Sequence, residues 1–207
     1  MRTTLLAATA ALLSIPFAAR AQSMADALNN ACTVTWIGLD FSSARFVPAI
    51  DFAEVEGDTR TALLKWNNLM EQEPDKFNMG KALGITRCVT NTSFVKDLNE
   101  AVTADKLLSR EPYSLDKAKI PDMVNAYKTA GDGVGVVLIV STFDKTQAMA
   151  EYWITFFNMK THGMLYTEKL MGKPQGFGVR NFWAGSVYSV LKAIEKGHAK
   201  AWRGQFK

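Results

Sequence analysis

Three apolar runs in the last third of the chain limit its fold more than any other feature. Val134 to Val140 is continuously aliphatic, Tyr152 to Met159 is rich in aromatic and β-branched residues, and Met164 to Leu170 follows it. The segment Lys160 to Gly163, between the last two runs, has the length and the glycine of a tight turn. Runs of this kind, separated by turn residues, predict consecutive strands. The sequence therefore predicts an antiparallel meander in this part of the molecule.

A helix is expected to cover this meander. After the loop Gly176-Phe177-Gly178, apolar residues return at helical spacing and form one continuous stripe: Trp183, Val187, Val190, Leu191 and Ile194. A helix with such a stripe packs one side against a core and leaves its other side in water. We therefore predict that this last helix is a structural cover for the sheet.

Strand and helix patterns also alternate in the first two thirds of the chain. The run from Thr33 to Phe41 is apolar on both faces and rich in β-branched and aromatic residues, which indicates a buried central strand. Helical periodicity predicts helices after Asp58, after Thr92 and from Pro121 to Ala130. With the meander, these elements predict an α/β (α+β) fold, a two- or three-layer sandwich around a mixed sheet, in one domain that spans residues 22–207.

Residues 1–21 have the pattern of a signal peptide. Arg2 gives a positive start, Leu5 to Phe17 is an almost unbroken apolar run, and Ala19-Arg20-Ala21 is a cleavage signal of the A-x-A type. The alternative is a membrane anchor, but a membrane span needs about 20 apolar residues and this run is shorter. We therefore predict cleavage before Gln22 and a periplasmic or secreted protein with no transmembrane segment after cleavage.

The charge of the chain argues against nucleic acid as a partner. The full chain has a formal net charge of +4, and Arg2 and Arg20 leave with the signal peptide. The basic residues that gather toward the carboxyl end are Lys192, Lys196, Lys200, Arg203 and Lys207. Cations at the carboxyl end of a helix complement its dipole and keep its surface solvated, which is the favoured interpretation of this cluster. The alternative is that the cluster binds a membrane surface or an acidic partner. A nucleic-acid-binding face is expected to be more basic than this.

Two cysteines, Cys32 and Cys88, lie beside predicted strands. In an oxidising compartment, a small even number of cysteines favours a disulfide over two free thiols. The alternative of two thiols stays open, because the geometry of a disulfide is strict. We predict a disulfide between Cys32 and Cys88.

The residues of common catalytic and metal sites are scarce in this sequence. The chain has two histidines, His162 in the predicted turn and His198 near the carboxyl end. A zinc site or a serine–histidine–aspartate triad would need a special placement of one of them. Sequence motifs for metalloproteases, redox dithiols, hydrolases and nucleotide binding are absent. We therefore expect no metal, no cofactor and no catalytic activity.

One polar set nevertheless forms a candidate ligand site. Asp40 falls inside an apolar strand, where a buried carboxylate needs a partner. If Arg45 or Arg180 is that partner, a polar pocket forms at one end of the sheet. Independently, the segment from Gly176 follows a strand and opens a helix, so its free N–H groups and Arg180 could receive an anion. The candidate residues are Asp40, Ser42, Arg45, Gly176, Gly178, Arg180 and Asn181. Alternatively, Asp40 caps the turn that begins at Ser42, and the glycines only let the chain turn.

Two parts of the sequence resemble known proteins. The runs GVGVVLIV at 133–140 and YWITFFNMKTHGMLY at 152–166, with the glycine-rich turn and helix that follow, are similar to the meander of the TolB amino-terminal domain and of the curli-assembly and LpoB families of envelope proteins. Those families have an Asp-x-x-Thr-Gly hairpin; here Asn158 replaces the acid and His162 precedes the glycine. The segments Trp36 to Ser42 and Gly176 to Trp183 resemble an uncharacterised family of exported bacterial proteins.

The resemblance implies an envelope accessory or interaction domain that binds a partner protein and has no catalytic activity. The competing hypothesis is a small-ligand receptor or an enzyme that uses the end of the sheet near Asp40 and Arg180. A concave pocket that contains both residues favours the second hypothesis, and a filled end of the sheet favours the first.

Overall fold

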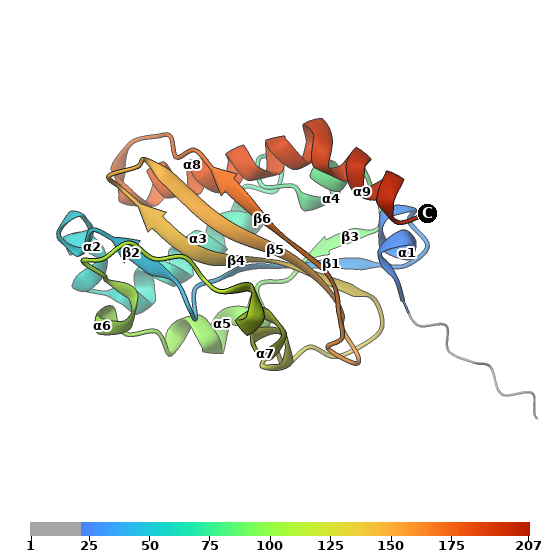
Figure 1. Ribbon diagram of the computed structural model, residues 1–207, viewed down its shortest axis with the longest axis horizontal. Helices are drawn as coiled ribbons and strands as arrows, with labels where there is room; N and C mark the ends of the chain where they lie inside the picture. Colours follow the sequence, from blue (N-terminus) through green and yellow to red (C-terminus); the bar gives the residue numbers. More distant parts are fainter. Residues whose placement is uncertain (1–21) are drawn as a thin grey trace, which may run out of the picture.

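A computed structural model describes residues 22–207 of the chain (Figure 1). The predicted signal peptide, residues 1–21, lies outside the described residues. The described part forms one sheet whose six strands are β1 (Val34–Asp40), β2 (Arg45–Val47), β3 (Cys88–Thr90), β4 (Val134–Asp144), β5 (Met149–Asn158) and β6 (Met164–Gly172). No helix among these residues is both long enough and apolar enough to cross a membrane.

The sheet is mixed, as the sequence predicts. Its strand order is β3-β1-β4-β5-β6, and β2 pairs with β4 beyond the end of β1. β1 runs parallel to β3 and β4, whereas β4, β5 and β6 are antiparallel neighbours. The predicted meander and the predicted α/β class are therefore confirmed.

Helices occupy both sides of this sheet. They are α1 (Met24–Leu28), η1 (Ala49–Phe52), α2 (Ala53–Glu56), α3 (Thr59–Gln72), α4 (Met79–Leu83), α5 (Ser93–Glu100), α6 (Ala104–Leu107), η2 (Lys117–Lys119), α7 (Ile120–Asn125), α8 (Gly178–Ala193), the π-helical turn η3 (Ile194–His198) and α9 (Ala199–Gln205). Local caps fix several starts: Asp58, for example, accepts a hydrogen bond from the Thr61 N–H at the start of α3.

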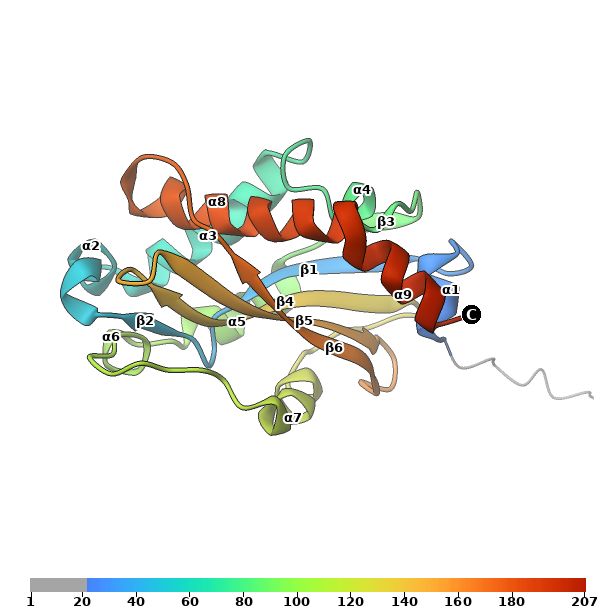
Figure 2. The ribbon, with the colours of Figure 1, turned by 45° about the horizontal axis from the view of Figure 1, so that its top comes forward.

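The sheet divides the core into two parts, which lie above and below the strands in Figure 2. On the α8 face, the helices α3, α4, α8 and α9 cover strand residues that include Trp36, Leu39, Leu138 and Ile154. On the α7 face, α5 and α7 cover strand residues that include Ile37, Val137, Ile139 and Phe157. The predicted stripe of the last helix is buried on the α8 face, so the predicted cover role of α8 agrees with the structure.

Two boundaries differ from the sequence prediction. β4 continues past Val140 to Asp144, because its last residues pair with both β2 and β5. α7 ends at Asn125 instead of Ala130, and the chain then returns to the sheet through glycines with positive φ, Gly131 and Gly133.

The predicted disulfide is not present in the structure. Cys32 and Cys88 are both free thiols and do not lie close to each other. The Cys32 thiol lies against the backbone of Val134 on β4, and the Cys88 thiol lies against the backbone of Trp36 on β1. β1 runs between β3 and β4. The Cys32 thiol therefore lies at β4 and the Cys88 thiol at β1, and the two do not meet.

Candidate functional site

Asp40 lies at the end of β1 and is completely buried. One carboxylate oxygen accepts a hydrogen bond from the Tyr127 hydroxyl at 2.7 Å, and the other accepts one from the Ser42 N–H at 2.8 Å. Burial raises the pKa of Asp40, and these hydrogen bonds oppose the rise. Asp40 therefore caps the turn at Ser42, which is the alternative that the sequence left open.

A bulge at Gly38 decides where Asp40 points. The pairing of β1 with β4 shifts between Trp36 and Leu39, and Gly38 has a φ of +88°. The side chain of Asn67 binds both the N–H and the carbonyl of Leu39 at this point, at 2.7 and 2.8 Å. A Cβ atom at Gly38 would lie 2.3 Å from the Asn67 amide oxygen, so only glycine fits. The bulge leaves Leu39 on the α8 face and turns Asp40 to the α7 face.

Arg180 lies on the other side of the sheet. Its backbone carbonyl accepts a hydrogen bond from the Trp66 indole at 2.9 Å, in the core of the α8 face. The exposed guanidinium of Arg180 bonds to Asn181 at 3.2 Å, and that of Arg45 stands 5.1 Å from the centre of the Tyr113 ring. The structure therefore does not assemble the predicted pocket around Asp40, Arg45 and Arg180.

The start of α8 retains only a small hollow beside Arg180. Gly176 and Gly178 have φ values of +122° and +74°, so they serve the tight turn into the helix. The hollow measures about 130 Å³, and its charged lining residues are Arg180, Lys65, Glu54 and Asp58. Two cations are balanced there by two carboxylates, so the hollow attracts an anion only weakly.

A polar cluster that the sequence analysis missed surrounds Glu151 on the α7 face. The hydroxyls of Ser114 and Ser141 donate to one oxygen of Glu151 at 2.6 and 2.7 Å, and the Lys169 ammonium lies 3.1 Å from the other. Serine, lysine and glutamate together invite a catalytic interpretation. However, both oxygens of Glu151 already have partners, and Ser141 also accepts from the N–H of Leu115 at 2.7 Å. The cluster fastens the segment before α7 to the sheet.

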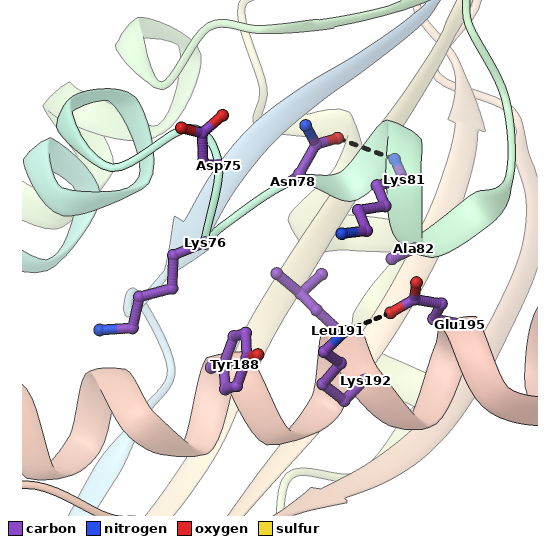
Figure 3. Close-up of a pocket in the computed structure, with 9 residues that line it drawn as sticks. All are labelled: Asp75, Lys76, Asn78, Lys81, Ala82, Tyr188, Leu191, Lys192 and Glu195. Atoms are coloured by element: carbon purple, nitrogen blue, oxygen red, sulfur yellow. Dashed lines mark hydrogen bonds and ion pairs between the residues drawn. The ribbon is translucent and has the colours of Figure 1, made fainter.

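A group of lysines lies on the outside of the α8 face, between α4 and α8 (Figure 3). This hollow of about 250 Å³, here called the basic cleft, is lined by Lys76, Asn78, Lys81, Tyr188, Lys192 and Glu195, with Asp75 at its rim. Ala82 and Leu191 form its buried floor. Asn78 positions Lys81, because its side chain accepts the hydrogen bond of the Lys81 N–H at 2.7 Å and so starts α4.

Lysines outnumber the carboxylates that line the basic cleft, and one of them, Lys76, is paired at 3.3 Å with Glu73 outside the lining. Glu195 accepts a hydrogen bond from Lys192 at 2.6 Å, which lowers the pKa of Glu195 and raises that of Lys192. The charges of Lys81 and Lys196 lower the pKa of Glu195 further. Several ammonium groups therefore surround this one carboxylate, and only one of them is neutralised by it.

A second hollow continues the basic cleft along α8. It measures about 510 Å³, and its lining includes Lys173, Gln175, Ser189 and Lys196. Tyr188 and Lys192 line both hollows, so the half-buried Tyr188 ring stands between two groups of lysines. Lys192 and Lys196 belong to the basic residues noted near the carboxyl end of the sequence. Lys81 and Lys173 were not grouped with them, because they come from α4 and from the segment after β6.

The lining of the basic cleft includes the lysines Lys76, Lys81 and Lys192 and the amide of Asn78. Its lysines and amides can hold an anion, and its lining residues include no cysteine, serine or histidine. Residues 22–207 contain no group of three or more histidine, cysteine or acidic residues that could hold a metal ion. Comparison of the chain with protein-family models, curated proteins and solved structures found no match.

Proposed function

We propose that this protein is an exported accessory domain of the cell envelope that acts by binding, and that the basic cleft holds an anionic group of its partner. The observation that carries the proposal is the excess of lysines around Glu195, in a hollow with a buried apolar floor. A concave, partly apolar site with a few convergent charged groups is the usual form of a binding site.

The placement of Asp40 supports binding over the competing hypothesis of a receptor or enzyme at the sheet end. Asp40 is fully buried, and Tyr127 and Ser42 bind its two oxygens. Arg180 belongs to the opposite face, beside Trp66. The two residues therefore do not share a pocket, which supports an accessory domain over a receptor or enzyme that uses both of them.

Export is tested separately from binding. The apolar run that precedes the Ala19-Arg20-Ala21 site predicts a mature protein that begins at Gln22. Mass spectrometry of the protein recovered outside the cytoplasm should give the mass of residues 22–207. A recovered protein that still begins at Met1 contradicts cleavage and removes the basis for an envelope location.

Binding is tested by recovering partners from an envelope extract with the mature protein. The double variant K81E/K196E removes two exposed lysines and keeps the Lys192–Glu195 ion pair. The matched control K117E/K119E makes the same change of charge in η2, next to α7, where both lysines are exposed. We expect the control to recover the same partners as the unchanged protein, and K81E/K196E to lose them. Equal recovery by all three proteins contradicts a role for the basic cleft.

A further inference from the structure

The two hollows along α8 point to the class of ligand, and this inference rests on the proposed function. We propose that the basic cleft binds an acidic polysaccharide whose chain crosses Tyr188 from one hollow to the other. A single small anion fills one hollow only, whereas the lysines stand on both sides of Tyr188. A chain with repeated negative charge contacts both groups of lysines at once.

The aromatic ring favours a sugar over a simple polyanion. Tyr188 is half-buried, lines both hollows and has the Lys192 ammonium 5.8 Å from its ring centre. The C–H face of a sugar ring can stack on the exposed part of a half-buried ring such as that of Tyr188 while its charged group reaches the neighbouring lysines. Tyrosine provides a rigid apolar surface for such contact.

The polar residues that line the two hollows favour an acidic sugar over an acidic protein segment as the ligand. Asp75 and Glu195 add carboxylates to a site with excess positive charge, and Asn78, Gln175 and Ser189 add neutral polar groups. Carboxylate and amide oxygens accept hydrogen bonds from hydroxyls, which a polysaccharide has in large number. An acidic peptide segment has backbone N–H donors but no hydroxyl on its acidic side chains, so it offers fewer donors to these acceptors than a polysaccharide does.

A membrane surface fits these residues less well. The site is concave, whereas a bilayer presents a flat surface into which apolar side chains insert. Among the described residues, the large apolar side chains that are most exposed are Ile50 and Phe177, at 85% and 95%. Neither of them lines the two hollows along α8.

The proposal is tested by calorimetric titration of the mature protein with defined probes. These are a hexamer of galacturonic acid, dextran sulfate, the neutral sugar maltohexaose, poly-L-glutamate, and vesicles that contain an anionic phospholipid. We expect at least one acidic polysaccharide to bind at least about tenfold more tightly than maltohexaose or poly-L-glutamate, a difference of about 1.4 kcal/mol. Binding should weaken as salt is raised, because exposed charges are screened.

Variants at Tyr188 and at the lysines distinguish a failure of the polysaccharide inference from a failure of anion binding by the cleft. Tyr188→Ala should weaken polysaccharide binding by about tenfold, and Tyr188→Phe, which keeps the ring, should restore most of it. Tighter binding of poly-L-glutamate or of the vesicles, or an unchanged affinity in Tyr188→Ala, overturns the polysaccharide inference while anion binding stands. If no anionic probe binds, both this inference and anion binding by the cleft are wrong. If anions bind equally to the protein and to K81E/K196E, the cleft is not their site, and both are again wrong.

Discussion

On the α8 face of the sheet the core is almost wholly apolar, whereas on the α7 face buried carboxylates take part in it. Four of the five tryptophans belong to the α8 face, and the rings of Phe143 and Trp183 stack there at a centroid distance of 4.5 Å. The α7 face holds Asp40 and Glu151, each bound by hydroxyl donors. One face is stabilised by buried area and packing, and the other also depends on complete hydrogen bonding.

This difference bears on where a binding site can lie. The basic cleft is built on the outside of α8, whose inner side is anchored by Trp183, Val187 and Leu191 in the larger core. Lysines there are held on a rigid element, and their replacement leaves the core untouched. On the α7 face, the carboxylates of Asp40 and Glu151 already accept hydrogen bonds from neighbouring groups and so stabilise the fold.

The largest effect is expected for Trp183→Ala on the α8 face. Trp183 is fully buried and stacks on Phe143 and Phe52, so its removal leaves a cavity among rings that cannot collapse into it. We expect a loss of about 3–5 kcal/mol in the free energy of unfolding, measured by urea titration. A loss below about 1 kcal/mol would show that the α8 face is loosely packed and that the contrast between the faces is wrong.

Tyr127→Phe tests the hydrogen bonding of the α7 face. The change keeps the ring but removes the hydroxyl that binds Asp40, and it should destabilise the protein by about 1–3 kcal/mol because a buried acceptor loses its donor. The matched control is Tyr152→Phe on the α8 face, whose hydroxyl bonds to the neutral Ser186. The control should lose less, about 0.5–1.5 kcal/mol. The opposite order would contradict the special role of the carboxylate.

Asp40→Asn tests the same face through its pH dependence. Burial raises the pKa of Asp40 in the folded protein, so the folded state holds more protons than the unfolded state between the ordinary and the raised pKa. Stability from this group is therefore fully present below the ordinary pKa and is lost as pH rises through the raised one. As pH falls from 7, the unchanged protein should gain stability relative to Asp40→Asn, measured by urea titration at several pH values. A constant difference would mean that burial does not perturb Asp40.

How much the sequence predicts depends on whether a feature is local. Runs of β-branched and aromatic residues, such as Val134 to Val140, correctly give the strands and the meander. The side on which Asp40 points was not predictable, because strict alternation from Trp36 places it on the α8 face with Arg180 and the bulge at Gly38 reverses this. The basic cleft was missed for a related reason. Its lysines come from α4, the segment before it and α8, and only the packing of those elements unites them.

The smallest effect on stability is expected for Lys196→Gln. This variant distinguishes the solvent-exposed side of α8, where we propose binding, from its buried side, which supports the fold. Lys196 is exposed in the turn η3 and lines the second hollow beside Tyr188. Its replacement should leave the midpoint of urea unfolding unchanged, because exposed side chains contribute little to the folded state. The same variant should weaken the binding of an acidic polysaccharide, because one of the ammonium groups around Glu195 is lost. A drop in stability with unchanged binding would assign Lys196 to the fold, and the outer surface of α8 would then resemble the structural clusters of the α7 face.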